Sequence, residues 1–194
     1  MSAEILAVCT GNICRSPLTE RLLRSGLDQL WGADAADVVV HSAGTRAMVG
    51  RAMVPESQSR LLDRGGDATG FLARQLETPM TRGATLVLAL TRAHRAAIVE
   101  EHPVAARYTF TLREIARLVA DLAPSEVAGD TAADRVRGLA AAAGRRRGML
   151  PPVPAEEDDV IDPYGGDAAL HDLAAAQITP AVRELLRLLA PTAR

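Results

Sequence analysis

The opening segment of the chain constrains its fold more than any other feature. An apolar run at residues 5–8 leads directly into the turn-forming sequence Cys9-Thr10-Gly11-Asn12. Ser16 and Pro17 then have the pattern of a helix N-cap and a first helical position, and leucines follow at helical spacing. We therefore predict a buried strand, a tight loop and a helix at about residues 17–31, the unit from which parallel sheets are built.

The remainder of the chain continues this alternation of strands and helices. Short apolar runs predict three more strands, at residues 38–40, 86–90 and 108–110. Amphipathic or alanine-rich segments predict further helices, at residues 55–64, 92–101, 112–122, 131–143 and 168–189. The pattern predicts the α/β class, with a four-stranded parallel sheet that is doubly wound and flanked by helices.

The length of 194 residues and the 48% share of hydrophobic residues fit one domain with a sizeable core. We expect a single domain over residues 1–194, with an extended helical and loop segment at about residues 112–157. Two charged runs, at residues 145–147 within that segment and 156–159 at its end, are interpreted as solvated surface.

Composition argues against several classes of protein. Aromatic residues make up only 3% of the chain, and 22 basic residues stand against 24 acidic ones, for a net charge of −2. Neither stacking platforms nor a surplus of basic charge is present, so we expect no nucleic-acid or membrane partner. There is also no apolar run long enough to span a bilayer and no basic leader.

The cysteines and histidines argue against a structural metal or a disulfide framework. Cys9 and Cys14 are the only cysteines, so a reducing, cytoplasmic location is expected. The histidines lack metal-ligand spacing and are interpreted as surface or cap residues: His41, His94, His102 and His171. We expect neither a metal nor a cofactor.

The spacing Cys9-x5-Arg15 carries the predicted chemistry. Its cysteine would lie at the carboxyl end of the first strand, where open α/β sheets bind ligands, and its loop would aim backbone N–H groups at an anion. Arg15 could bind a phosphate with both arms of its guanidinium. The same field stabilises a thiolate at Cys9, which is the nucleophilic form. The loop therefore predicts phosphoryl transfer through a phosphocysteine.

Such a reaction needs an acid for the leaving oxygen and a base for the water that follows. Asp162-Pro163-Tyr164, on the loop before the last predicted helix, supplies a candidate in Asp162.

Together these residues resemble a known family, the low-molecular-weight protein tyrosine phosphatases. The resemblance rests on Val8-Cys9-Thr10-Gly11-Asn12-Ile13-Cys14-Arg15-Ser16-Pro17, Ser42-Ala43-Gly44-Thr45, Ala73-Arg74 and Asp162-Pro163-Tyr164, in the family's order. It implies hydrolysis of phosphomonoesters, in particular protein phosphotyrosine, and inhibition by phosphate or other oxyanions. Its substrates would be phosphorylated proteins or small phosphomonoesters.

The resemblance also implies roles for individual residues. Cys9 would be the nucleophile, Arg15 the phosphate clamp and Asp162 the acid and then the base. Ser16 would donate its hydroxyl to the thiolate, Asn12 would hold the loop through Ser42, and Tyr164 would line the substrate mouth. The phosphate-binding loop would comprise Thr10, Gly11, Asn12, Ile13, Cys14, Arg15 and Ser16.

The chain departs from the family pattern in three places. Phe71 stands where members often carry a histidine, two residues before the Ala-Arg pair. Arg46-Ala47-Met48 stands where an aromatic residue is common, so a substrate ring would meet Tyr164 and Met48. The segment at residues 112–157 is longer than the usual connection.

Other interpretations remain open at this level. A thiol-cofactor-dependent arsenate reductase shares the fold and the cysteine after the first strand, although the loop and Asp162 fit it poorly. A catalytically silent phosphate-binding regulatory module would keep the loop without turnover. Cys14 is either a packing residue or a redox partner that captures oxidised Cys9.

Overall fold

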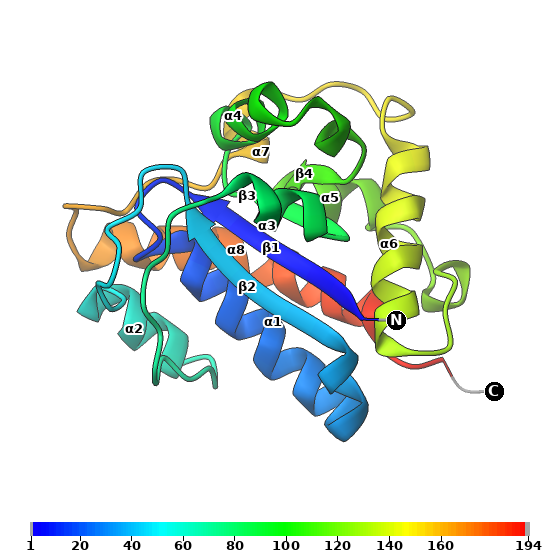
Figure 1. Cartoon of the computed structure of the whole chain (residues 1–194), viewed down its shortest axis with the longest axis horizontal. Coiled ribbons are helices and arrows are strands. Elements are labelled where there is room, and N and C mark those ends of the chain that lie inside the picture. Colours follow the sequence, from blue (N-terminus) through cyan, green and yellow to red (C-terminus); the bar gives the residue numbers. More distant parts are fainter. Residues whose placement is uncertain (1, 193–194) are drawn as a thin grey trace.

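A four-stranded parallel sheet forms the centre of the molecule, in a computed structural model that describes residues 2–192. The strand order is β2-β1-β3-β4 (Figure 1). The strands are β1 (Ala3–Cys9), β2 (Val38–Gly44), β3 (Leu86–Ala89) and β4 (Thr109–Thr111). The predicted α/β class and the parallel sheet are confirmed.

The register of the strands brings their carboxyl ends to one edge of the sheet. Cys9 pairs with Gly44 of β2, and Val8 pairs with Ala89 of β3. The chain leaves β1 toward β2 on one side and reaches β3 on the other, so the strand order reverses beside β1. Ligands of doubly wound sheets bind at such a point.

Helices cover both faces of the sheet. One face carries α1 (Arg15–Trp31), α5 (Leu112–Val119) and α8 (Ala168–Leu189), with α2 (Pro55–Leu62) against α1 and α8. The other carries α3 (Thr78–Gly83) and α4 (Arg92–Glu101). The remaining helix α6 (Ala132–Arg146) lies beside the start of β1 in Figure 1. Shorter elements are η1 (Gly32–Asp37), η2 (Pro103–Arg107), η3 (Pro124–Glu126) and α7 (Ala155–Asp158).

Alternation along the strands divides the core into two layers. Ile5 belongs to the larger apolar cluster with α1, α5, α6 and α8, whereas Leu6 and Val8 belong to the smaller one against α4. Leu86 and Leu88 face the first layer and Val87 the second. Both faces of the central strands are therefore buried, which explains their continuous apolar sequence.

Several boundaries differ from the sequence predictions. Strand β2 continues to Gly44 rather than ending near residue 40, because polar Ser42 is buried and hydrogen-bonded instead of marking a turn. Helix α1 begins at Arg15, two residues earlier than expected, since the loop turns directly into the helix. The short helix α3 was not predicted; its Thr78-Pro79 start offers only a one-turn signal.

The two charged runs are solvated only in part: Arg145, Glu156 and Glu157 are exposed as expected, but for Arg147 and Asp158 the interpretation was wrong. The Arg147 guanidinium lies 3.9 Å from the centre of the Phe110 ring and donates to the Thr109 carbonyl at 2.7 Å. The Asp158 side chain is only 6% exposed and pairs with two arginines. The Arg147 stem covers apolar surface while its head binds a carbonyl, and the Asp158 carboxylate is buried because Arg92 and Arg117 bind it.

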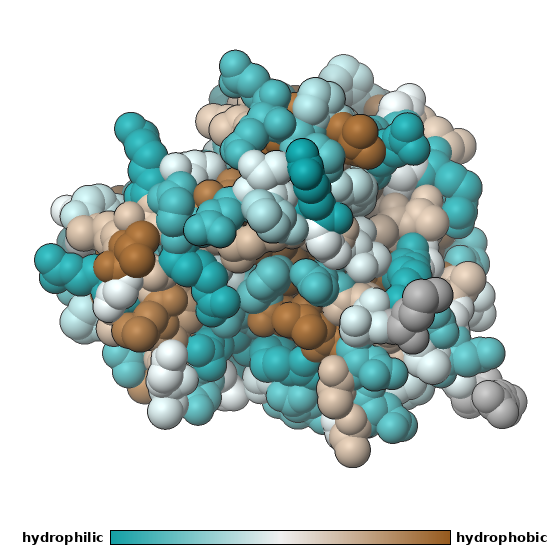
Figure 2. Space-filling model, viewed as in Figure 1, coloured by the Kyte–Doolittle hydropathy of each residue, from teal (hydrophilic) through white to brown (hydrophobic). Residues whose placement is uncertain are grey.

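From the sequence, no membrane-spanning segment is expected in the chain. Among the helices of residues 2–192, none is both long and apolar enough to cross a bilayer. On the face drawn in Figure 2, hydrophobic side chains form small separate groups among hydrophilic ones. This face therefore presents no broad apolar patch.

Candidate active site

The loop between β1 and α1 wraps around Cys9 at the sheet edge. Asn12 has a φ of 55°, the one positive value at a non-glycine position among residues 2–192. Gly44, at the end of β2, approaches the loop so closely that a Cβ there would lie 2.3 Å from the Thr10 carbonyl oxygen. The tight curvature and the missing side chain at Gly44 let the loop close around a small anion.

A buried hydrogen-bond network fixes the loop around Asn12. The Asn12 amide nitrogen donates to Ser42 Oγ at 2.7 Å and to Ser16 Oγ at 2.9 Å, and its oxygen accepts the Arg74 N–H at 2.8 Å. Ser16 Oγ lies 2.9 Å from Cys9 Sγ. Because Asn12 already donates to Ser16, the Ser16 hydroxyl proton is free to point at the Cys9 sulfur.

Glu20 completes this network and was missed by the sequence analysis. Its carboxylate accepts the Ser42 hydroxyl at 2.6 Å, and the side chain is buried. Burial raises the pKa of Glu20, and the hydrogen bond from Ser42 opposes that rise. The sequence feature that could have revealed Glu20 is its position one helical turn after Ser16, on the same side of α1. Phe71, which stands where the family often has histidine, is buried in the apolar core.

His94 also reaches the loop, so its interpretation as a surface or cap residue was incomplete. Its Nε2 lies 2.9 Å from Thr10 Oγ1 and its Nδ1 lies 2.8 Å from Thr91 Oγ1. Burial, together with the positive charge of Arg15, lowers the pKa of His94 to about 4. His94 therefore braces the loop as a neutral ring. His171 is buried as well, 3.0 Å from Ser57 Oγ.

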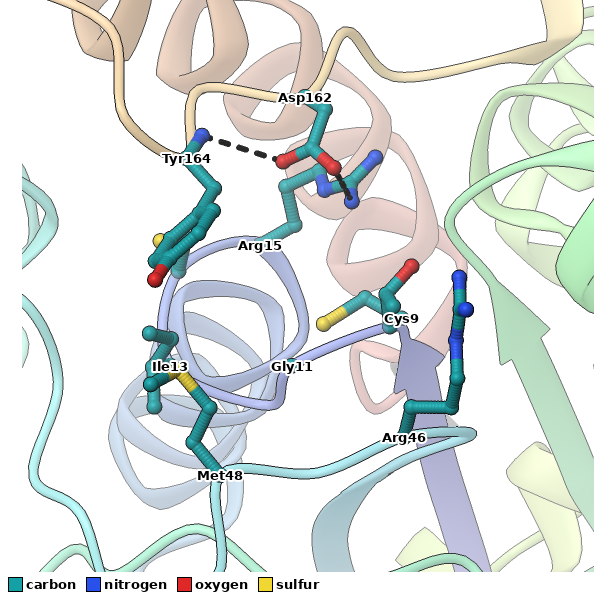
Figure 3. Close-up of a pocket in the computed structure, with 10 residues that line it drawn as sticks. Cys9, Gly11, Ile13, Arg15, Arg46, Met48, Asp162 and Tyr164 are labelled. Carbon is teal, nitrogen blue, oxygen red and sulfur yellow. Dashed lines mark hydrogen bonds and ion pairs between the residues drawn. The ribbon is translucent and has the colours of Figure 1, made fainter.

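Arg15 and Asp162 meet across the mouth of the loop (Figure 3). One guanidinium nitrogen lies 2.7 Å from Asp162 Oδ2, and another donates to the Val160 carbonyl at 3.2 Å. The Arg15 side chain is 4% exposed, whereas that of Asp162 is 53% exposed. Asp162 Oδ1 accepts the Tyr164 N–H at 3.1 Å, which turns the chain back over the pocket.

A pocket of about 330 Å³ opens above Cys9. Ile13 and Met48 lie together on one wall, and the Tyr164 ring stands over them in Figure 3. Arg46 projects beside Cys9 on the other side. The floor thus collects the thiol, Arg15 and loop backbone, while the walls are largely apolar. Asp162 and Tyr164 enter from the loop before α8.

Cys14, the redox candidate, is buried against the main core. Burial raises its pKa to about 11, with a further contribution from Cys9. It lines the pocket from the end of the loop, so the structure places both cysteines at this site. No three His, Cys, Asp or Glu side chains gather as a metal-binding group within residues 2–192.

Comparison with known proteins identifies the family to which this geometry belongs. Residues 4–123 match the model of the family described as low molecular weight phosphotyrosine protein phosphatase. The chain belongs to this family. It is 33% identical over 109 residues to the low molecular weight protein-tyrosine-phosphatase Ptp of Acinetobacter johnsonii, covering 56% of this chain and 71% of that protein. It is 39% identical over 114 residues to a protein-arginine-phosphatase of Geobacillus stearothermophilus, covering 59% and 72%.

Solved structures of the low molecular weight phosphatases share the fold over nearly the whole chain. The YwlE arginine phosphatase of Geobacillus stearothermophilus superposes with a TM-score of 0.66 and 28% identity, over 95% of this chain and 90% of that one. The low molecular weight protein tyrosine phosphatase of T. tengcongensis gives 0.67 and 26%, over 95% and 97%. The chain is therefore a phosphatase of this fold, and an arsenate reductase is not favoured.

Proposed function

We propose that the chain hydrolyses protein phosphotyrosine through a phosphocysteine on Cys9, with Arg15 as the phosphate clamp and Asp162 as the acid and then the base. The observation that carries this proposal is the convergence of three groups in one pocket. Cys9 Sγ lies 2.9 Å from the Ser16 hydroxyl, and Arg15 lies 2.7 Å from Asp162. Cys9, Arg15 and Asp162 line the same pocket, so nucleophile, cation and proton donor can act on one bound phosphate.

The first step transfers the phosphoryl group to the enzyme. The Cys9 thiolate attacks phosphorus, an S–P bond forms and the bond to the leaving oxygen breaks. Asp162 donates its proton to that oxygen, which leaves as a phenol. Backbone N–H groups of residues 10–16 and the amino terminus of α1 stabilise the equatorial oxygens, and Arg15 binds two of them. These are the proposed roles of Thr10, Gly11, Asn12, Ile13, Cys14, Arg15 and Ser16.

The second step releases inorganic phosphate. Asp162, now a carboxylate, takes a proton from water, whose oxygen attacks phosphorus as the S–P bond breaks. Cys9 leaves as a thiolate, and the Ser16 hydroxyl donates to it. Asn12, braced by Ser42, keeps Ser16 in place.

The shape and polarity of the pocket support phosphotyrosine as the substrate. Ile13, Met48 and Tyr164 offer apolar contact to a flat ring. Arg46 adds positive charge at the rim, which opposes a cationic guanidinium more than a neutral ring. Both tyrosine and arginine phosphatases are among the relatives, so phosphoarginine is the second candidate.

We further propose that residues 1–194 act as one phosphatase domain. Buried residues of α6, from the segment at residues 112–157, share the apolar cluster that contains α1 and α8. The long segment is therefore supported as part of the same folding unit. A cytoplasmic location fits the reduced cysteines that the chemistry requires.

Peptide hydrolysis tests the proposal. Matched peptides carrying phosphotyrosine, phosphoserine or phosphoarginine should be compared by phosphate release and kcat/KM. Phosphotyrosine should be hydrolysed fastest, without added metal and with inhibition by phosphate or vanadate. Faster hydrolysis of phosphoarginine would show that the proposed substrate is wrong, while the phosphocysteine mechanism would still hold. Tight phosphate binding with no turnover of any peptide would instead indicate the regulatory module.

A further inference from the structure

The loop that carries Asp162 is anchored by a buried carboxylate four residues earlier. Asp158 Oδ2 accepts hydrogen bonds from Arg92 of α4, at 2.5 Å and 3.1 Å, and Asp158 Oδ1 accepts one from Arg117 of α5 at 3.1 Å. The Asp158 side chain is 6% exposed. One carboxylate therefore ties two helices from different parts of the chain to the start of the loop.

The residues that follow Asp158 extend this anchor toward the pocket. Asp159 Oδ1 accepts the backbone N–H of Arg92 at 2.7 Å, and the Asp159 carbonyl accepts the Arg113 guanidinium at the same distance. The Val160 N–H then donates to the Leu90 carbonyl at 2.8 Å, which attaches the segment to the end of β3.

Asp162 itself is held much less firmly. More than half of its side chain is exposed, and the contacts that the structure gives its carboxylate are Arg15 and the Tyr164 N–H. A phosphate that binds Arg15 takes over the first of these contacts. Asp162 must then stay near the leaving oxygen by virtue of the chain before it, which Asp158 fixes and which Gln177 supports through the Ile161 N–H at 2.9 Å.

We propose that Asp158, clamped by Arg92 and Arg117, is a positioning residue that holds Asp162 at the leaving oxygen while substrate occupies Arg15. The inference rests on the proposed function, in which Asp162 is the general acid. It also gives a role to the long segment at residues 112–157, because Arg117 and Asp158 lie at or near its two ends. A clamp of this kind acts on the proton transfer and leaves phosphate binding to the loop.

The test removes the charge of the Asp158 carboxylate and keeps the size of the side chain. In Asp158→Asn, kcat and KM should be measured with phenyl phosphate and with p-nitrophenyl phosphate, whose leaving group needs protonation less. We expect kcat/KM for phenyl phosphate, which reports phosphoryl transfer to Cys9 and not the later hydrolysis step, to fall roughly tenfold, part of the usual contribution of general acid catalysis. The loss of kcat/KM for p-nitrophenyl phosphate should be several times smaller, and the inhibition constant for phosphate should change by less than about twofold.

Asp121→Asn is the matched control. Asp121 pairs with Arg146 at 2.5 Å within the same segment, and its side chain is 70% exposed, so this variant removes a carboxylate–arginine pair that does not anchor the loop. This variant should keep the activity of the unmodified protein on both substrates. Thermal unfolding of both variants should show whether the clamp also contributes to stability.

A double variant separates positioning from general damage. If Asp158 acts through Asp162, then Asp158→Asn in an Asp162→Asn background should slow phenyl phosphate no further than Asp162→Asn alone. A further loss, an equal loss on both substrates in the single variant, or no loss at all would overturn the inference. Absence of turnover in the unmodified protein would instead contradict the proposed function.

Discussion

Arg15 and Asp162 are ion-paired at 2.7 Å, although the proposed mechanism gives them different duties toward the same phosphate. The guanidinium is buried and the carboxylate is half exposed. A substrate dianion therefore competes with Asp162 for Arg15 and also meets the negative charge of that carboxylate. The pair keeps the guanidinium oriented toward the pocket while Asp162 remains free to move to the leaving oxygen.

Removal of the Asp162 charge should separate binding from catalysis. In Asp162→Asn we expect kcat to fall by roughly 10² to 10⁴, the usual share of general acid and base catalysis. Phosphate should bind more tightly, because no carboxylate competes for Arg15. Inhibition constants for phosphate, together with kcat and kcat/KM on two aryl phosphates, check both statements. Equal losses of kcat/KM for good and poor leaving groups, or weaker phosphate binding, would contradict this role.

Replacement of the nucleophile should abolish turnover and leave the phosphate-binding loop intact. In Cys9→Ser the loop donors, Arg15 and the network around Asn12 remain, so calorimetry should still detect phosphate or vanadate binding. The rate should fall by several orders of magnitude because an alcohol of ordinary acidity replaces the thiolate. A chelator should leave the unmodified protein active. Persistent hydrolysis by Cys9→Ser, or loss of activity on chelation, argues against a phosphocysteine.

Local patterns were sufficient to predict the strand, loop and helix around Cys9. An apolar strand, turn residues and a proline that starts a helical pattern lie next to one another in the sequence, although Cys14 and not Ser16 holds the N-cap position. The helices at residues 92–101 and 168–189 were likewise predicted at their observed bounds. The positions of Cys9, Arg15 and Asp162 in one pocket agree with the sequence analysis.

Contacts between distant residues could not be predicted from such patterns. Glu20 on Ser42, His94 on Thr10 and Arg92 on Asp158 each join elements that only the packed sheet brings together. A charge or a histidine in a sequence has no visible partner, and solvation is the default interpretation. The packing of α1, α4 and the segment before α8 around the sheet edge creates these pairs.

The buried His94 should make stability depend on pH below neutrality. Its pKa is about 4 in the folded protein and near 6.5 when unfolded, so between these values the unfolded chain binds a proton that the folded one does not. Stability should therefore fall as pH decreases from about 6.5 to about 4, by at most about 3 kcal/mol.

The measurement is urea unfolding of the unmodified protein and of His94→Gln across that range. Other titrating groups are common to both proteins, so the difference between their stabilities isolates the histidine. The gap should narrow as pH falls, because only the unmodified protein bears the cost of keeping this ring neutral. If the unfolding free energies of the two proteins change in parallel with pH, the pKa of His94 is the same in the folded and unfolded states, which would contradict this prediction.

Cys14 should capture oxidised Cys9 slowly at neutral pH and faster in alkali. Peroxide converts an accessible thiolate to a sulfenic acid, and a second thiolate can displace hydroxide from that sulfur to form a disulfide. Burial gives Cys14 a pKa of about 11, so its thiolate fraction rises about tenfold per pH unit up to that value. The rate of Cys9–Cys14 linkage should rise in proportion, and bound phosphate should protect Cys9.

Mass spectrometry of peroxide-treated protein at several pH values follows this linkage, and reductant should restore activity in proportion to it. Cys14→Ser should be active before treatment yet lose activity irreversibly under strong oxidation, because nothing intercepts the sulfenic acid. The control is the unmodified protein treated at neutral pH, where Cys14 reacts slowly and Cys9 should also be over-oxidised. A non-reducible Cys9 adduct without any link at alkaline pH would leave Cys14 a packing residue, whose buried thiol serves only the core.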